Sequence, residues 1–234
     1  MSALTSCPNP LLRGWRFASG APGPNPYYRF MRRFFQVTMC SLWKVRVFER
    51  RREPAGGGAL YVCNHQSFLD PMLMSFALRR PMNYMARDSL FRAPGFRQII
   101  RSLNAFPVRR GAADTGAIKE AMRRLKRGGQ VVVFPEGTRT RDGTVGPFLP
   151  GVAILAQRAA EWTVPVLIDG AFEAWPRQQL LPSTGSVVVR YAEPISQADA
   201  RRRNPVEFVA AVREVIVAMQ ADTRRRLGKP AFHG

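Results

Sequence analysis

His65 and Asp70 are the residues whose types and spacing most directly suggest chemistry. They lie five positions apart, and the only other histidine of the chain is His233. A neutral imidazole is well suited to take a proton from a hydroxyl near pH 7, and a nearby carboxylate fixes its tautomer and stabilises the imidazolium. The pair therefore indicates an acyl-transfer or hydrolytic site.

Both residues also have a structural interpretation. Most histidines in folded proteins have their hydrogen bonds satisfied without doing chemistry, and Asp70 followed by Pro71 is typical of an aspartate N-cap at the start of a helix. Ser67 stands close to His65 but lacks the Gly-x-Ser-x-Gly setting of a nucleophilic serine. The residues alone leave open whether Asp70 orients His65, starts a helix, or does both.

Two arginines follow a short apolar run in the segment 106–111, which reads FPVRRG. The planar guanidinium suits a phosphate monoester because it offers paired donors and keeps its charge at any relevant pH. Arg109 and Arg110 are therefore candidates for a phosphate site, although arginines are frequent on the surface of so basic a chain.

A denser cluster of polar residues occupies 134–141, which reads FPEGTRTR. We expect it to recognise phosphate and hydroxyls together, with Thr138 supplying a hydroxyl and Arg139 binding phosphate. Gly137 would allow close backbone approach, and Glu136 would accept hydrogen bonds or orient an arginine. The alternative is a solvent-exposed turn in which the glutamate pairs with an arginine.

An α/β domain is needed to position these clusters, since strand-like and helix-like runs alternate along the chain. His65 and Glu136 each follow a predicted buried strand, and ligands gather at the carboxyl ends of such strands. Pro165, inside another strand-like run, suggests an edge, a bulge or the wall of a pocket. We expect strands over 45–48, 60–63, 82–86, 105–108, 131–134, 164–168 and 187–190, and helices over 72–78, 96–103, 118–126, 151–160 and after Asn204-Pro205.

An amphipathic helix is predicted over 27–44, with aromatic and apolar residues on one face and Arg29, Arg32, Arg33 and Gln36 opposite. Its longest stretch without a charge is far shorter than the roughly 20 residues of a membrane span. Such a helix can lie in a membrane interface, and the alternative is a helix packed on the domain.

The charge and composition of the chain restrict the kinds of partner that it can bind. The 234 residues carry a formal net charge of +20, which attracts phosphate-bearing partners such as anionic lipid, acidic carriers or nucleic acid. No nucleic-acid motif is present, so we expect no nucleic-acid partner. The three cysteines lack the spacing of a zinc site. The start of the chain lacks the pattern of a secretory signal, so we expect a peripheral protein on the cytoplasmic face of the cell membrane.

The expected organisation has three parts. Residues 1–26, rich in proline and glycine, would form a mobile leader. Residues 27–44 would form the membrane-surface helix. Residues 45–228 would form a single catalytic domain, with a mainly parallel or mixed central sheet flanked by helices.

Four segments together resemble the glycerolipid acyltransferases of the lysophosphatidic acid acyltransferase group. NHQSFLD at 64–70 is similar to their NHxSxxD form of the His-x4-Asp motif, and FPEGTR at 134–139 is similar to their third block. Residues 106–110 resemble the arginine-bearing second block, and 164–166 resemble the proline-bearing fourth. All four occur in the order of the family, over roughly residues 43–195.

This resemblance implies acyl transfer from acyl-CoA or acyl carrier protein to the free hydroxyl of a lysophospholipid, foremost 1-acyl-sn-glycerol-3-phosphate, without a metal or other cofactor. By position, His65 would be the general base and Asp70 its orienting partner. The acceptor's phosphate would be held by Arg110, Glu136, Gly137, Thr138 and Arg139.

One residue departs from the pattern of the family. Many members carry a lysine where this chain has Leu149. The leucine, which has no charge, would weaken phosphate contact or alter the choice of acceptor. The alternative function is a lipid-binding or membrane-remodelling protein that keeps the acyltransferase fold without turnover.

Overall fold

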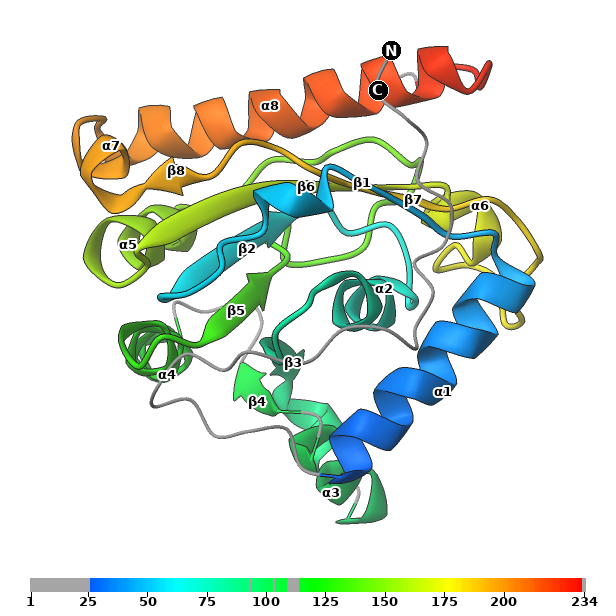
Figure 1. Ribbon diagram of the computed structural model, residues 1–234, viewed down its shortest axis with the longest axis horizontal. Coiled ribbons are helices and arrows are strands. Elements are labelled where there is room, and N and C mark those ends of the chain that lie inside the picture. Colours follow the sequence, from blue (N-terminus) through cyan, green and yellow to red (C-terminus); the bar gives the residue numbers. More distant parts are fainter. Residues whose placement is uncertain (1–25, 93, 103, 109–113, 233–234) are drawn as a thin grey trace.

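The computed structural model describes residues 26–92, 94–102, 104–108 and 114–232 and folds them into a mixed sheet with helices on both faces (Figure 1). The predicted fold class is confirmed. The leader predicted for 1–26 lies outside the described residues except for its last position, and Arg109 and Arg110 also lie outside them.

The sheet has eight strands in the order β1-β7-β6-β2-β5-β3-β4, with β8 beside β6. Five neighbours, β6, β2, β5, β3 and β4, run parallel, whereas β7 and β8 are antiparallel to β6 and β1 is parallel to β7. The carboxyl ends of the five parallel strands therefore share one edge. The bounds are β1 (Arg46–Phe48), β2 (Ala59–Cys63), β3 (Met82–Arg87), β4 (Ala105–Val108), β5 (Gln130–Val133), β6 (Trp162–Asp169), β7 (Val188–Tyr191) and β8 (Ile195–Ser196).

Both faces of the sheet are covered by helices. The central strand β2 has apolar side chains on each of its two faces, and each face must be buried. Tyr61 and Cys63 point into a core that includes α1 and α2, and Leu60 and Val62 point into a core shared with α4, α5 and α8. The helices are α1 (Pro26–Leu42), α2 (Asp70–Ala77), α3 (Pro94–Ser102), α4 (Thr115–Lys126), α5 (Gly151–Arg158), α6 (Ala171–Ala174), α7 (Gln197–Arg201) and α8 (Pro205–Arg226), with 3₁₀ turns η1 (Arg50–Arg52) and η2 (Asp88–Phe91).

Helix α1 both packs on the domain and presents an apolar stripe. Met39 joins the core, whereas Phe30, Phe34 and Val37 are exposed. The position predicted for Arg32, on a polar outer face, is wrong: Arg32 is buried and its guanidinium donates to the carbonyls of Leu78 and Arg79. Leu78 is the C-cap of α2 and Arg79 follows it, so the guanidinium lies at the helix end where the last carbonyls lack partners and the dipole favours a cation. No helix in the described part of the chain is long and apolar enough to span a membrane.

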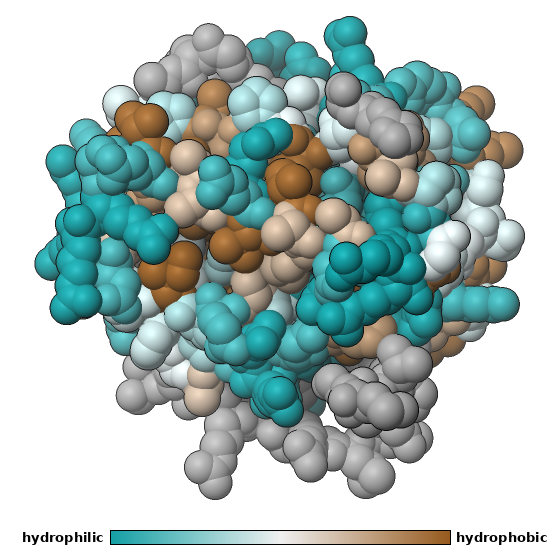
Figure 2. Space-filling model, turned by 90° about the horizontal axis from the view of Figure 1, so that it is seen from above, coloured by the Kyte–Doolittle hydropathy of each residue, from teal (hydrophilic) through white to brown (hydrophobic). Residues whose placement is uncertain are grey.

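The final helix, α8, is capped as predicted by Asn204, whose side-chain oxygen accepts from the amide of Glu207 at 2.9 Å. Phe208, Val212 and Ile216 are buried as expected. Val215, also predicted to face the core, is partly exposed because it lies at the edge of the buried stripe. Figure 2 views the face of the molecule that carries α8, where hydrophobic and hydrophilic side chains are interspersed.

Candidate active site

The predicted site residues gather at the carboxyl edge of the parallel strands. β2 lies between β5 and β6, so the loop that begins at Asn64 is flanked by the loops that begin at Phe134 and Gly170. Residues about 70 positions apart in the sequence thereby become neighbours, as expected for ligand-binding loops in an open α/β sheet.

His65 and Asp70 form a direct hydrogen bond, with 2.7 Å between Nδ1 and Oδ2. His65 is only 8% exposed and Asp70 is fully buried. The same carboxylate oxygen accepts from the backbone amides of Gln66 at 2.6 Å and Ser67 at 2.8 Å. With the Asp70 oxygen acting as an acceptor, the proton belongs on Nδ1 of His65, which leaves Nε2 to accept a proton from a substrate.

Asp70 does not act as an ordinary helix N-cap. It is the first residue of α2, and the position before it, Leu69, makes no side-chain cap. The Asp70 carboxylate instead accepts from residues that precede the helix. Of the alternatives left open by the sequence, the structure therefore has Asp70 starting the helix with its backbone and contacting His65 with its side chain.

Phe134 fixes the plane of the imidazole. Its ring stacks on that of His65 with 4.4 Å between centroids and 24° between planes. The His65 carbonyl accepts from the Thr140 amide at 2.8 Å, which ties the histidine backbone to the loop after β5. The rotation of the histidine is thus restricted from both its ring and its backbone.

Two buried side-chain amides, neither predicted as a site residue, hold the same loop. Asn64 makes a pair of 2.8 Å hydrogen bonds with the backbone of Ile168 in β6. Gln66 donates to the Gly143 carbonyl at 3.1 Å and accepts from the Phe172 amide at 3.2 Å. Their place in the sequence, directly after a buried strand, could have indicated this role, because a buried polar side chain needs hydrogen-bond partners.

Glu136 faces inward. Its two carboxylate oxygens accept from the backbone amides of His65 at 2.8 Å and Gly146 at 3.3 Å, rather than from an arginine as in a solvent-exposed turn. Burial raises the pKa of Glu136 to about 7, with the charge of Asp70 also raising it, against the lowering effect of the two amide bonds and of Arg213. Glu136 thus joins the loop after β5 to the histidine.

Gly137, Thr138 and Arg139 form the outer part of the turn. Gly137 has φ of +69°, in the left-handed region that glycine favours. Thr138 is exposed, and the Arg139 guanidinium lies 3.4 Å from the centre of the Phe68 ring. Since Phe68 belongs to the His65 loop, a cation lies beside the histidine segment.

Leu149 adjoins this turn. Its amide donates to the Pro135 carbonyl at 2.9 Å, and a Cβ at Gly137 would lie 3.2 Å from Leu149 Cδ1. The Leu149 side chain is largely exposed. A lysine here, as in many glycerolipid acyltransferases, would therefore extend from the surface next to the proposed phosphate site.

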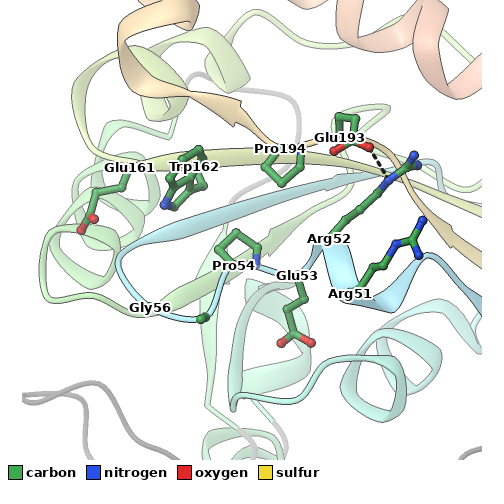
Figure 3. Close-up of a pocket in the computed structure, with 10 residues that line it drawn as sticks. Arg51, Arg52, Glu53, Pro54, Gly56, Glu161, Trp162, Glu193 and Pro194 are labelled. Carbon is green, nitrogen blue, oxygen red and sulfur yellow. Dashed lines mark ion pairs between the residues drawn. The ribbon is translucent and has the colours of Figure 1, made fainter.

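A pocket of about 690 Å³ lies elsewhere, at the amino ends of β2 and β6 (Figure 3). Trp162 and Pro54 line it, and an ion pair of 2.7 Å joins Arg52 to Glu193 at its rim. Because the loops that carry His65 and Glu136 are at the carboxyl ends of the parallel strands, this pocket is separate from the candidate site. In the described residues, His, Cys, Asp and Glu form no group of three that could hold a metal ion.

Comparison with known proteins finds acyltransferases. The chain is 27% identical over 190 residues to a 1-acyl-sn-glycerol-3-phosphate acyltransferase of Bacillus subtilis, covering 81% of this chain and 92% of that one. It is 28% identical to the enzyme of that name from Cocos nucifera, covering 74% of this chain but only 56% of that one.

A solved structure shares the fold. The crystal structure of the 1-acyl-sn-glycerophosphate (LPA) acyltransferase PlsC from Thermotoga maritima matches with a TM-score of 0.74 and 26% identity, over 84% of this chain and 79% of that one. The model of the acyltransferase family matches residues 44–169, more than half of the chain and including the segments of both His65 and Glu136. The chain therefore belongs to the acyltransferase family.

Proposed function

We propose that the protein transfers a fatty acyl group from a thioester donor, acyl-CoA or acyl carrier protein, to the free hydroxyl of 1-acyl-sn-glycerol-3-phosphate, giving phosphatidic acid. The observation that carries the proposal is the buried 2.7 Å hydrogen bond between His65 and Asp70. The names of the relatives from Bacillus subtilis, Cocos nucifera and Thermotoga maritima support this acceptor.

His65 acts as the general base. Its Nε2 takes the proton of the acceptor hydroxyl while the hydroxyl oxygen attacks the thioester carbonyl, and the same proton then passes to the leaving thiolate. Asp70 holds the tautomer and stabilises the imidazolium that forms in between. No acyl-enzyme is needed, and Ser67 is engaged structurally, since its hydroxyl donates to the Trp175 carbonyl at 2.8 Å and accepts from the Leu69 amide at 3.2 Å.

The turn after β5 receives the acceptor's phosphate. Arg139, Thr138 and the backbone at Gly137 supply the charge, the hydroxyl and the close approach, and Arg110 adds a second guanidinium. Glu136 contributes by holding the His65 amide, so that binding of phosphate and placement of the base depend on one turn. Orientation of two substrates in one site can lower the barrier by several kcal/mol.

The protein works at a membrane surface, peripheral and on the cytoplasmic side. Support comes from the exposed stripe of Phe30, Phe34 and Val37 on α1, beside the exposed Arg29 and Arg33. Apolar side chains insert into the interface while arginines meet anionic headgroups, each cation adding on the order of 1 kcal/mol. The net charge of +20 favours both this surface and an acidic donor.

An assay of thiol release tests the proposal. Purified protein would be offered acyl-CoA and acyl carrier protein thioesters with a panel of lysolipids, and we expect thiol release that depends on 1-acyl-sn-glycerol-3-phosphate and yields phosphatidic acid. Equal release without any acceptor would identify a hydrolase. Binding of lysolipid without release, from either donor, would identify a lipid-binding protein that keeps the fold without turnover.

A further inference from the structure

Two adjacent leucines stand out on the segment that joins α6 to β7. Leu180 is 89% exposed and Leu181 is 76% exposed, the highest values among the large hydrophobic residues of the described chain. Single exposed leucines are ordinary on protein surfaces, but two neighbours exposed to this degree form an apolar projection that calls for an environment other than water.

The leucines project from a segment that is held in place on both sides. Before them, the Trp175 indole donates to the Gln179 carbonyl at 3.2 Å, and the Gln179 amide donates to the Pro176 carbonyl at 3.2 Å. After them, the Ser183 amide donates to the Ala174 carbonyl at 2.7 Å. Their exposure therefore belongs to a tied turn, which we call the dileucine loop, residues 176–183.

The dileucine loop touches the elements around the active site. The Trp43 indole, just after α1, donates to the Ser183 carbonyl at 2.7 Å. At the other end, Trp175 lies with its ring centroid 5.3 Å from that of Phe68, and its carbonyl accepts from Ser67. The loop is thus placed between the end of α1 and the segment that carries His65.

Cations accompany the leucines. Arg177 is exposed on the loop itself, and Arg141 is exposed where its carbonyl accepts from the Gln178 side chain at 3.4 Å. An apolar tip next to guanidinium groups matches the two layers of an anionic membrane surface, since headgroup phosphates lie just outside the acyl region. This charge pattern favours a lipid bilayer over an apolar protein surface.

We propose that the dileucine loop is a second membrane contact, separate from the stripe of α1. Leu180 and Leu181 insert into the acyl boundary of an anionic bilayer, and Arg177 and Arg141 contact headgroup phosphates. Two contacts, one on α1 and one on the dileucine loop next to the His65 segment, fix the tilt of the domain so that His65 faces the lipid. The proposal rests on the proposed function only in that the acceptor is a membrane lipid.

The test is vesicle flotation, with vesicles of phosphatidylcholine and phosphatidylglycerol. It compares the wild type with one double variant and one single control variant. Leu180→Asp/Leu181→Asp should bind roughly tenfold or more weakly than the wild type, because two apolar insertions are lost and two repelling charges added. Val206→Asp is the control, since Val206 is 75% exposed on α8, away from the loop, and should bind as the wild type does. Circular dichroism and thermal melts would verify that both variants fold.

Equal vesicle binding by the wild type and the dileucine variant would overturn the proposal. A second result would also overturn it. If sedimentation shows that the wild type is a dimer and the dileucine variant a monomer, while both bind vesicles equally, then a second copy of the chain covers the loop. Flotation requires no turnover. An inactive wild type would therefore contradict the proposed function, while the flotation result would still decide the role of the loop.

Discussion

At the scale of single residues, the candidate site is organised by two carboxyl groups, which accept hydrogen bonds from backbone amides and, at Asp70, from the ring of His65. One oxygen of Asp70 accepts from His65, Gln66 and Ser67, and Glu136 accepts from His65 and Gly146. His65 is therefore held through its ring by one acid and through its backbone by another. Substituting the two acids should therefore have different effects, because Asp70 contacts the imidazole ring and Glu136 contacts only the backbone amide of His65.

Asp70→Asn should preserve the fold and lower kcat. The amide oxygen of asparagine can still accept the two backbone amides, but it supplies no negative charge to the imidazolium. We expect kcat to fall roughly 100-fold or more, with little change in KM. Steady-state kinetics and a urea melt would check this. A variant that is unfolded would instead assign Asp70 a structural role, and one with normal kcat would remove it from the mechanism.

Glu136 should make stability depend on pH. Its pKa is raised from 4.5 to about 7, so the folded state keeps the proton between these values while the unfolded state loses it. The free energy of unfolding therefore falls as pH rises from about 4.5 to about 7, by up to roughly 3 kcal/mol, and is level above that window as far as this group is concerned.

Urea unfolding of Glu136→Gln across this pH range would check the prediction, since glutamine does not titrate. Its free energy of unfolding should lack the fall seen in the wild type, whatever its absolute value. Glu214→Gln removes an exposed carboxyl and serves as the control. Parallel pH profiles for Glu136→Gln and the wild type would contradict the inward, desolvated position of Glu136.

Leu149→Lys should tighten binding of the phosphorylated acceptor. The new ammonium would stand beside the turn of Gly137. For an exposed pair we expect about 1 kcal/mol, or roughly a fivefold lower KM, which should diminish at high salt. Val206→Lys adds the same charge on α8 and should leave KM unchanged. If both variants lower KM equally, the effect is one of net charge, and the position of Leu149 has no special part in binding.

Sequence alone predicted His65, Asp70 and the FPEGTR turn, because chemistry-bearing residues there are consecutive or nearly so. It did not predict the inward role of Glu136 or the bonds of Gln66. Those depend on Gly143, Gly146 and Phe172, which are far from the histidine in the chain and meet it only after the sheet has formed.

At the scale of elements, the end of α8 is joined to the end of β6 by a buried ion pair. Arg224 lies 3.1 Å from Asp169, with side chains that are 4% and 0% exposed, and the same guanidinium stacks on Phe232. Burial raises the pKa of Asp169, and the charges of Arg224 and Lys229 oppose that effect. The arginine therefore favours the charged form of this buried carboxyl group.

Arg224→Ala should destabilise the protein by about 3 kcal/mol, because among the described residues it leaves the buried carboxylate of Asp169 with only the more distant Lys229. Arg225→Ala is the matched control: its side chain is 80% exposed and pairs with Asp222, so its loss should cost less than about 1 kcal/mol. Urea unfolding of both variants measures the difference. Similar losses would show that burial does not strengthen the dependence on Arg224.

The predicted elements carry a clear hydrophobic signal, since a continuous apolar run indicates a buried strand even when it is short and a long helix shows a period. The apolar run predicted as a strand over 131–134 is β5, Gln130–Val133, and the helix predicted after Asn204-Pro205 is α8. The elements that were not predicted, α6, α7 and β8, have four, five and two residues. A helix of four or five residues is too short to show a helical period, and the two residues of β8 form no apolar run, so tertiary contacts decide the form of these elements.

At the scale of the whole molecule, the site depends on a helix beyond the segment matched by the acyltransferase family. That match ends at residue 169, yet Gln220 of α8 donates to the Gly143 carbonyl at 3.0 Å, the same carbonyl that Gln66 contacts. Arg213 of α8 donates to the carbonyls of Val145 and Gly146. Helix α8 therefore supports, through the loop at 143–146, the amide and carboxylate contacts that hold His65.

The most direct test of the account is acyl transfer by His65→Ala. With labelled acyl-CoA and 1-acyl-sn-glycerol-3-phosphate in vesicles, the wild type should form labelled phosphatidic acid. The variant should be slower by roughly 100-fold to 10,000-fold while binding the same vesicles and unfolding at a similar urea concentration. Phosphatidic acid formation by His65→Ala at the rate of the wild type would contradict the assignment of His65 as the base.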